Sequence, residues 1–451
     1  MTALSTRSHS TAKGGGPIAP IDLQDGAILL LEESHALPLV AITVAFRSGS
    51  AHDPDEKSGT LRLAGRMLRR GCEGLKATEI EDALDRLGGE LSVDVSSSSI
   101  AFHGHVIGRN LDAFVDLVAT ILGAPTFQED EFERLRREAI AELVESRDND
   151  QALVQHAFRR SLFAGHPYGR SARGTTATVA AIGLLDVRAA YARHLTRANA
   201  VVGIAGDVMA AAAPDIGKRL LARLPVGARI PDGVPPPTAP RGRSLTFVDK
   251  PERTQTQILI GSLGTAPHDE DHVALGVANA ILGGSFTSRL MREVRSKRGW
   301  SYGAYARLSS DRQRHAFSMW TFPAATDAAA CIELEIGLLE TFLEKGVTQK
   351  ELSFIKRFLM RSYAFDVDTA LKRLHQALDV EILGLPADYY SGYVAHVNAV
   401  TLEQANASVK ARLSSEDLVI SVVGTAPSLY EAVCAKIPRL GSHEVVPFDK
   451  D

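Results

Sequence analysis

The sequence has few cysteines and no long apolar run. Its three cysteines, Cys72, Cys331 and Cys434, are odd in number and far apart, which fits neither a disulfide framework nor a cysteine zinc site. No stretch approaches the roughly 18–20 apolar residues of a membrane-spanning helix. Residues 1–20 lack the apolar segment of a secretory signal. We therefore expect a cytoplasmic protein with no membrane partner, or a periplasmic one if a signal peptide has been removed.

An excess of one charge is also missing. Fifty Lys and Arg residues face 54 Asp and Glu residues, so the formal net charge is −4. This balance does not draw the molecule to a phosphate backbone, and nucleic acid is not an expected partner. With 451 residues, of which 45% are hydrophobic and 23% charged, the chain is not of the disordered class and is long enough for two to four domains.

What is present is an internal repeat. The segment from Val179 to Gly206 can be laid on the segment from Val397 to Gly424 with an offset of 218 residues. Asp150, Ala152 and Leu153 keep that offset to Asp368, Ala370 and Leu371. A repeat of this length predicts two similar domains.

The apolar patterns of the two halves agree with this repeat. In the first half they predict strands over residues 27–31 and 39–46, an alternating ribbon over 91–107, and helices over 111–122 and 130–145. In the second half they predict strands over residues 245–248 and 257–262, a ribbon over 301–322, and helices over 274–282, 328–343 and 350–363.

We therefore predict an α+β fold of two homologous domains, each an antiparallel-rich sheet covered by helices, facing each other around a cleft. Residues 226–243 carry five prolines and are interpreted as the linker, because proline cannot join a strand ladder. The predicted divisions are a flexible leader (1–21), an N-terminal domain (22–225), the linker (226–243) and a C-terminal domain (244–451).

The most informative segment for function is residues 281–302. Gly283 and Gly284 permit a sharp turn, a basic helix end follows, and Gly299 is a natural residue after a helix terminus. Arg295 and Tyr302 then lie on either side of one helix-to-strand turn and are expected to point into the same space. The pattern by itself also fits a structural reading, with a basic helix end and a tyrosine in the core.

This segment resembles the corresponding part of the pitrilysin/insulinase-type metallopeptidases, a family that includes mitochondrial processing peptidase. The resemblance rests on Gly-Gly-x-x-x-Ser-Arg-Leu, the basic run and the Gly-x-x-Tyr turn, and it extends over roughly residues 22–440. In that family an Arg and a Tyr seven residues apart bind the substrate backbone and help hold the scissile carbonyl. The resemblance assigns these roles to Arg295 and Tyr302.

The zinc motif of that family is missing. Active members carry His-x-x-Glu-His on the helix after the glycine that matches Gly59, where two His bind zinc and the Glu activates water. Here Arg62, Gly65 and Arg66 stand at those positions. A third ligand, a Glu about 75 residues on, corresponds to Glu142, which by itself is most simply an exposed helix acid. We therefore expect no metal in this chain.

The family includes two-subunit peptidases in which one chain carries the zinc motif and the other supplies the Arg/Tyr pair. By resemblance, this chain is the second kind: a non-zinc-binding subunit, incomplete as an enzyme by itself, that binds a peptide substrate beside a homologous partner holding the zinc. No cofactor is expected in the chain itself. The alternative is a structural scaffold of the same fold without peptidase activity.

Two histidine patterns offer competing readings. His268, Asp271 and His272 have the spacing of a helical metal site in an independent hydrolase, although acids at this point also suit a helix N-terminus. His103 and His105 share one face of a predicted strand, which is more often a half-exposed sheet surface than a ligand pair.

Overall fold

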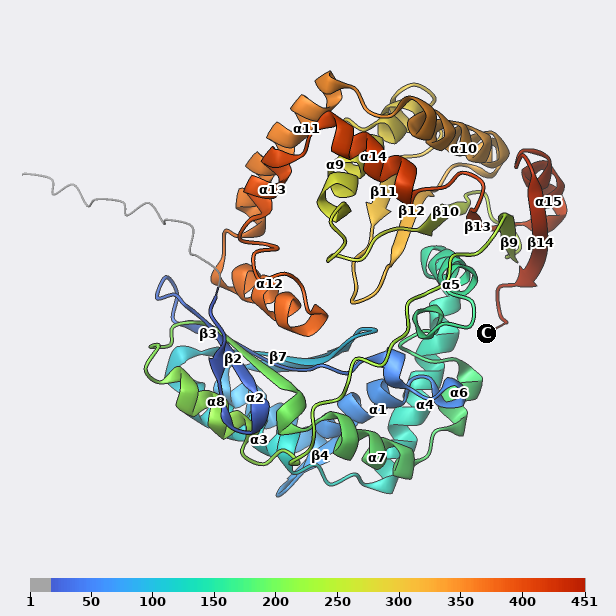
Figure 1. Ribbon diagram of the computed structural model, residues 1–451. Helices are drawn as coiled ribbons and strands as arrows, with labels where there is room; N and C mark the ends of the chain where they lie inside the picture. The colour runs from blue at the N-terminus through green and yellow to red at the C-terminus, as the bar shows by residue number, and fades with distance from the viewer. Residues whose placement is uncertain (1–17, 451) are drawn as a thin grey trace, which may run out of the picture.

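The computed structural model describes residues 18–450 and contains two halves, each built on a six-stranded sheet (Figure 1). The predicted leader lies outside the described residues as far as residue 17. Its last residue, Ile21, belongs to the first strand, where it pairs with Leu29. The α+β class and the two sheet-bearing domains predicted from the sequence are confirmed.

The N-terminal sheet has the strand order β1-β2-β8-β3-β7-β6. Only β2 and β8 pair in parallel; the other neighbours are antiparallel. The strands are β1 (Ile21–Asp22), β2 (Ile28–Glu33), β3 (Leu39–Phe46), β6 (Glu90–Val95), β7 (Ile100–Ile107) and β8 (Ala200–Gly206). A separate hairpin joins β4 (Gly71–Cys72) to β5 (Leu75–Lys76).

The C-terminal sheet has the order β11-β12-β10-β13-β9-β14, with β9 parallel to both of its neighbours. Its strands are β9 (Arg243–Asp249), β10 (Gln257–Leu263), β11 (Ala304–Leu308), β12 (Ala316–Thr321), β13 (Val419–Gly424) and β14 (Leu440–Pro447). The predicted ribbons over residues 91–107 and 301–322 are the hairpins β6–β7 and β11–β12.

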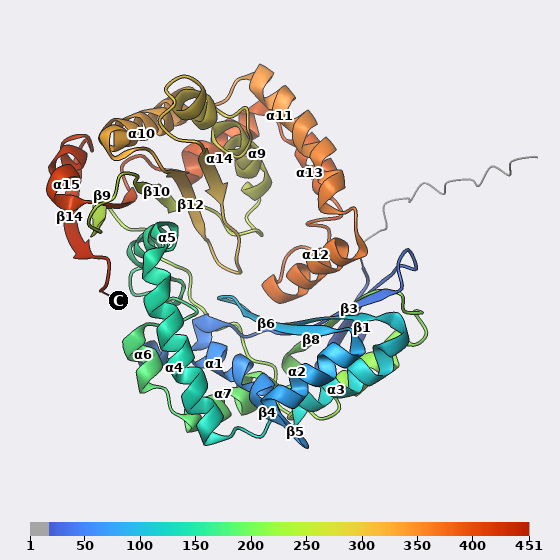
Figure 2. The same ribbon diagram turned by 180° about the vertical axis from the view of Figure 1, so that it is seen from behind.

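Helices cover the outer face of each sheet (Figures 1 and 2). In the N-terminal half they are α1 (Thr60–Met67), α2 (Ala77–Leu87), α3 (Leu111–Gly123), α4 (Glu129–Glu145), α6 (Thr176–Ala181), α7 (Leu184–His194) and α8 (Ala213–Leu221). In the C-terminal half they are α9 (His272–Leu282), α10 (Ala328–Lys345), α11 (Gln349–Ser362), α13 (Tyr393–Ala399), α14 (Leu402–Arg412) and α15 (Ala426–Ala435).

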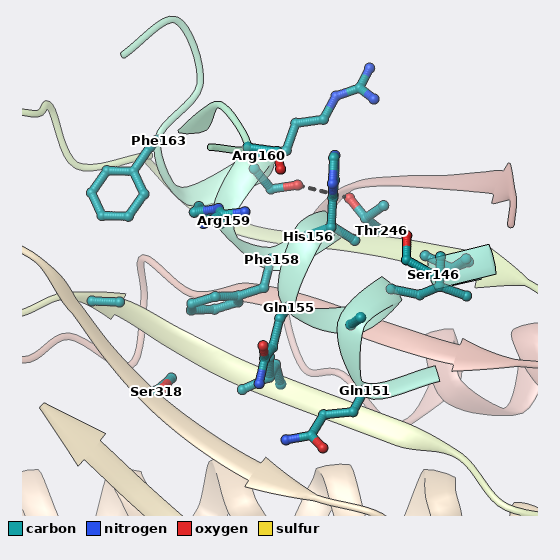
Figure 3. A pocket seen from close by; sticks show the side chains of 18 of the residues that line it. Ser146, Gln151, Gln155, His156, Phe158, Arg159, Arg160, Phe163, Thr246 and Ser318 are labelled. Atoms are coloured by element: carbon teal, nitrogen blue, oxygen red, sulfur yellow. Dashed lines mark hydrogen bonds between the residues drawn. The ribbon is translucent and has the colours of Figure 1, made fainter. Parts of the chain in front are cut away.

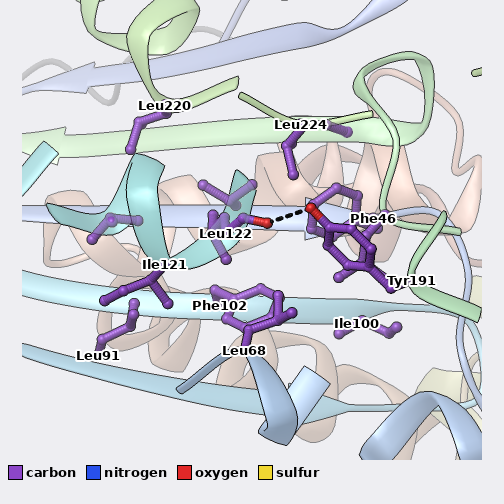
Figure 4. Close-up of a cluster of buried hydrophobic side chains, with 14 of the residues drawn as sticks. Phe46, Leu68, Leu91, Ile100, Phe102, Ile121, Leu122, Tyr191, Leu220 and Leu224 are labelled. Carbon is purple, nitrogen blue, oxygen red and sulfur yellow. Dashed lines mark hydrogen bonds between the residues drawn. The ribbon is translucent and has the colours of Figure 1, made fainter. Parts of the chain in front are cut away.

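The core of the N-terminal half lies between its sheet and these outer helices. Phe46 and Phe102 meet edge to face at 6.3 Å, and Ile121 and Leu122 of α3 pack in the same fully buried cluster (Figure 4). The hydroxyl of Tyr191 donates a hydrogen bond of 2.9 Å to the Leu122 carbonyl. This bond satisfies the one polar atom that the tyrosine brings into the core.

The inner face of each sheet is covered by a helix from the other half. Helix α5 (Asp150–Leu162), in the N-terminal half of the sequence, packs on β9, β10 and β13 of the C-terminal sheet. Helix α12 (Ala370–Leu383) packs on β2, β3 and β8 of the N-terminal sheet. Figures 1 and 2 show both helices between the two sheets. The apolar strand β3 is therefore buried on both faces, and the two halves are held together by exchanged helices.

The exchanged helices correct one detail of the predicted repeat. The helices begin after Asn149 and Thr369, and both cap residues accept a hydrogen bond from a backbone N–H three residues on. These caps are 220 residues apart, so the predicted match of Asp150 to Asp368 is wrong by two residues. The offset of 218 holds farther on, where Leu195 and Leu413 follow α7 and α14. The segment from α12 to α14 is therefore two residues shorter than the segment from α5 to α7.

The proline-rich segment runs between α8 and β9 and touches both halves. His166 bonds through Nε2 to the Pro235 carbonyl at 2.7 Å, and Gln313 donates to the Val234 carbonyl at 3.2 Å. Arg243, the last residue of the predicted linker, instead begins β9, and its buried guanidinium pairs with Glu340 at 2.7 Å.

Candidate functional site

The positions that correspond to the zinc motif form an ion-pair cluster. Helix α1 places Arg62 and Arg66 one turn apart, facing Glu142 of α4. Arg66 donates two hydrogen bonds to the Glu142 carboxylate, at 2.7 and 2.9 Å, and Arg62 lies 3.6 Å from it. Partial burial favours a higher pKa for Glu142, but the two guanidinium groups outweigh it and hold the pKa below its usual value. Glu142 is thus an ionised partner of arginine rather than an isolated helix acid.

This donor set does not fit zinc. Guanidinium groups have no lone pair to offer a metal, and their positive charge opposes a cation. Gly65, at the position of the family's general base, faces the N-terminal sheet, where an added Cβ would lie 3.0 Å from a methyl group of Val93. Across residues 18–450 no group of three His, Cys, Asp or Glu side chains is arranged to hold a metal ion. The cluster fills this position with fixed charges of opposite sign.

Arg295 and Tyr302 lie side by side. A short π-helical segment, Met291–Ser296, carries Arg295, and Gly299, with φ of +67°, reverses the chain before Tyr302. The Arg295 guanidinium lies 4.8 Å from the centre of the Tyr302 ring and 4.9 Å from that of Phe286. A cation between two ring faces is held in place without losing its hydrogen-bond donors.

This pair is open to solvent. Tyr302 is 77% exposed and Phe286 is 72% exposed, so the core reading of the tyrosine is wrong. The neighbouring Glu293 pairs with Lys297 at 2.7 Å and with Arg298 at 3.0 Å. Within residues 18–450, Arg295 makes no ion pair. Its donors and the phenol remain available to a ligand.

A cavity of about 1040 Å³ surrounds α5; its wall includes one residue of the ion-pair cluster, Arg62, but neither Arg295 nor Tyr302. The N-terminal half contributes Arg62 to its wall, and the C-terminal half contributes Gly283 and Gly284, which open the segment leading to Arg295. Figure 3 shows α5 crossing the strands of the C-terminal sheet, with Arg159 and Arg160 projecting in different directions. Sequence reasoning missed this helix as part of a site; the adjacent arginines in an otherwise amphipathic helix were the available signal.

The alternative metal site does not assemble. His272 begins α9, and its two ring nitrogens bond the Thr265 hydroxyl at 2.8 Å and the Tyr389 hydroxyl at 2.9 Å. Asp271 pairs with Arg412 at 2.7 Å, and His268 is exposed. The structure therefore gives His268, Asp271 and His272 structural contacts at a helix N-terminus, as the competing reading of the sequence suggested.

The other histidine pair divides between two environments. His105 is half exposed and lies 3.4 Å from Glu90. His103 accepts or donates a 3.1 Å hydrogen bond with Thr43 and meets the ring of His375 from α12 at 5.8 Å. His103 thus takes part in the contact between α12 and the N-terminal sheet.

In the part of the chain that the structure describes, no helix is long and apolar enough to cross a membrane.

The fold is that of two sheet-bearing domains, each completed by a helix from the other half. Residues 28–176 match the family described as "Insulinase (Peptidase family M16)", and residues 181–359 match "Peptidase M16 inactive domain". The chain belongs to the M16 family and lacks its zinc motif.

Several relatives share nearly the whole length. The chain is 24% identical to the "Non-peptidase homolog YmxG" of Helicobacter pylori, over 88% of this chain and 91% of that protein. It is also 24% identical to the "Uncharacterized zinc protease YmxG" of Bacillus subtilis, over 90% and 98% of the two chains.

Solved structures show the same architecture. The peptidase M16 inactive domain from Pseudomonas fluorescens superposes with a TM-score of 0.84 at 26% identity, covering 90% of this chain and 97% of that one. A protease from Helicobacter pylori superposes with a TM-score of 0.82 at 18% identity, over 91% of this chain and all of the other, which bears on the fold alone.

Proposed function

We propose that this chain is the non-zinc-binding, substrate-binding subunit of a heterodimeric zinc metallopeptidase. A homologous partner carries the zinc and the general base, and this chain supplies Arg295 and Tyr302 to clamp the peptide. The observation that carries the proposal is the pairing of an unneutralised guanidinium with an exposed phenol, beside a domain whose metal position is filled by arginine.

The chemistry of the pair suits this role. Attack on a peptide carbonyl places negative charge on its oxygen, and fixed hydrogen-bond donors aimed at that oxygen lower the barrier. A guanidinium has five N–H donors and a phenol has one O–H donor. Stacking of Arg295 between Phe286 and Tyr302 positions these donors in advance. Arg295 and Tyr302 cannot activate water, so this chain is not expected to cleave peptides by itself. The partner would activate water but would lack these donors, so it is not expected to cleave peptides by itself either.

The name of the Helicobacter pylori relative, a non-peptidase homologue, supports a chain that lacks peptidase activity of its own. It is equally compatible with a scaffold role, in which the protein forms a stable complex that cleaves nothing with any metal. Activity of the assembled complex distinguishes the two functions.

The test is to co-express this chain with a homologue that has an intact His-x-x-Glu-His motif and to measure peptide cleavage by the purified complex. Arg295→Ala is expected to lower kcat/KM by about 10²–10³, the usual cost of one oxyanion donor. Tyr302→Phe keeps the ring under Arg295 but removes the hydroxyl, so it isolates the phenol's contribution.

Arg292→Ala is the matched control, because Arg292 is an exposed arginine on the same segment and lies 3.6 Å from Glu293. It should leave cleavage unchanged. Both test variants should still co-purify with the partner. Full activity of Arg295→Ala and Tyr302→Phe in an intact complex would exclude the clamp role.

A further inference from the structure

The cavity around α5 has a strongly unequal charge. Its wall contains six arginines and one lysine but only two carboxylates, Asp94 and Glu444. The cations are Arg62, Arg147, Arg159, Arg160, Arg173, Arg307 and Lys450. The whole chain carries a net charge of −4, so this local excess runs against the balance of the molecule. A cavity lined by one sign of charge concentrates field and attracts ligands of the opposite sign.

Three of these arginines come from different segments and have no acidic partner among residues 18–450. Arg159 lies on α5, Arg173 on the loop before α6, and Arg307 on β11. Several arginines outside the cavity are paired with carboxylates, as where Arg219 pairs with Asp112 at 2.6 Å and with Asp116 at 2.8 Å. The cavity therefore holds cations that the fold itself does not neutralise.

Arg159 is the least compensated of the three. Its Nε atom is buried and has no hydrogen-bond acceptor among the described residues. Burial lowers the pKa of Arg159, and no carboxylate acts in the opposite direction. A buried guanidinium donor without an acceptor costs stability, and a ligand that brings an acceptor recovers that cost.

The cations act on common neighbours. Burial lowers the pKa of His315; nearby Asp311 opposes this, while the positive charges of Arg159 and Arg307 add to the lowering. Burial also lowers the pKa of Arg62, and the positive charges of Arg66 and Arg173 add to this lowering, while Glu142 opposes it. Arg159 with Arg307, and Arg62 with Arg173, thus form two cationic regions in one cavity.

The remaining wall suits a polypeptide. Tyr305 and Trp320 stack at 5.7 Å with an angle of 26° between their rings, and both line the cavity. Gln151, Gln155 and Ser318 add amide and hydroxyl groups that can bond a peptide backbone (Figure 3). Aromatic surface with a few polar groups is typical of ligand sites.

We propose that this cavity binds an acidic segment of the peptide substrate, so that the subunit selects peptides rich in Glu or Asp. Carboxylates of this segment would pair with Arg159, Arg307 and Arg173, because guanidinium and carboxylate groups form paired, charge-assisted hydrogen bonds. The inference rests on the proposed substrate-binding function, whose own test is cleavage by the assembled complex.

The experiment measures binding by the full chain alone, without partner or zinc. The probe is a fluorescein-labelled peptide containing several Glu residues, followed by fluorescence anisotropy. Matched peptides carry Gln or Lys in place of every Glu. We expect the Glu peptide to bind at least about tenfold more tightly than the Gln peptide, with the Lys peptide weakest and the preference reduced by salt.

The double substitution Arg159→Gln/Arg307→Gln is expected to weaken binding of the Glu peptide by about tenfold or more and to leave the Gln peptide unaffected. The control is Arg109→Gln/Arg361→Gln, which removes the same charge from two exposed arginines outside the cavity. Because Arg159 is partly buried, the exposed Arg307→Gln is measured alone as well, and thermal unfolding verifies that each variant is folded.

Equal affinity for the Glu and Gln peptides would overturn the acidic preference and leave the clamp role of Arg295 and Tyr302 to its own assay. An equal loss in the control variant would also overturn it, because the effect would then be one of net charge. If inorganic phosphate binds to the cavity arginines while the Glu peptide does not, the site is an anion site of another kind and the proposal fails.

Discussion

The two exchanged helices occupy equivalent places but make different contacts. Helix α12 seals its sheet: Leu374 and Leu378 are buried against Gly203, where an added Cβ would lie 3.1 Å from a methyl group of each leucine. Ion pairs from Arg373 to Glu32 and from Arg47 to Glu381 fix it at 2.7 and 3.2 Å. Helix α5 is anchored by Lys250 and Asp150 at its start but lies in a large cavity.

Corresponding residues explain the difference. At the structural offset of 220 residues, Val154, Phe158 and Leu162 of α5 match Leu374, Leu378 and Ile382 of α12, and all six are buried. Beside this common apolar stripe, Arg159 and Arg160 stand where α12 has Asp379 and Val380. The apolar stripe therefore packs each helix on the sheet of the other half. The flanking residues differ, so that α12 closes over its sheet while α5 borders a cationic cavity.

The largest effect is expected where the seal is broken. Leu374→Ala should lower the free energy of unfolding by about 2–5 kcal/mol, because it leaves a void in a fully buried contact. Urea unfolding followed by circular dichroism measures this. Lys372→Ala, an exposed change on the same helix, should stay within about 0.5 kcal/mol. A cost for Leu374→Ala no larger than this control would show that α12 does not hold the halves together.

A second buried ionisable group, a carboxyl in the C-terminal half, extends the comparison. Glu335 of α10 is 0% exposed, and no ion pair compensates its carboxyl among the described residues. Burial raises its pKa to about 8, although the nearby Thr321 hydroxyl opposes this rise. In the unfolded chain the Glu335 carboxyl loses its proton near pH 4.5, whereas in the folded protein it keeps the proton up to about pH 8. Stability should therefore fall as pH rises from about 5 to 8, by about 3 kcal/mol.

The substitution Glu335→Gln should remove most of this pH dependence and stabilise the protein above pH 7. Unfolding measured at several pH values tests it, with the exposed Glu344→Gln on the same helix as control. A pH dependence that survives in Glu335→Gln would place the responsible group elsewhere.

The smallest effect concerns the cavity itself. Arg159→Met removes a partly buried cation without an acceptor and keeps an unbranched side chain, so it should be neutral or stabilising by up to about 1 kcal/mol. The measurement is again the free energy of unfolding. A clear loss of stability would mean that Arg159 supports the contact between α5 and its sheet, and is not kept for a ligand.

Much of the architecture follows from local patterns. The helices over residues 328–345 and 349–362 and the hairpin over residues 304–321 agree closely with the predicted ranges, because amphipathic periodicity and turn residues are properties of neighbouring residues. The proximity of Arg295 and Tyr302 was also predictable, since one turn joins them. The exposure of Tyr302 was not, because burial depends on what the rest of the chain places over a residue.

The exchange of helices between the two halves could not be predicted from the sequence. Val154 and Phe158 mark an apolar face on α5, but their spacing does not say which sheet covers it. Nor does it show that Arg62, Arg159 and Arg307, from three distant segments, line one cavity.

The sequence by itself determined the repeat, the two α+β halves and the absence of a His-x-x-Glu-His motif, since these depend on residue identity and local order. Only the tertiary structure decided that Arg62 and Arg66 face Glu142, that each half is completed by a helix from the other, and that one of these helices lies in a cationic cavity. Such contacts join residues far apart in the chain, and packing between surfaces, rather than local periodicity, selects them.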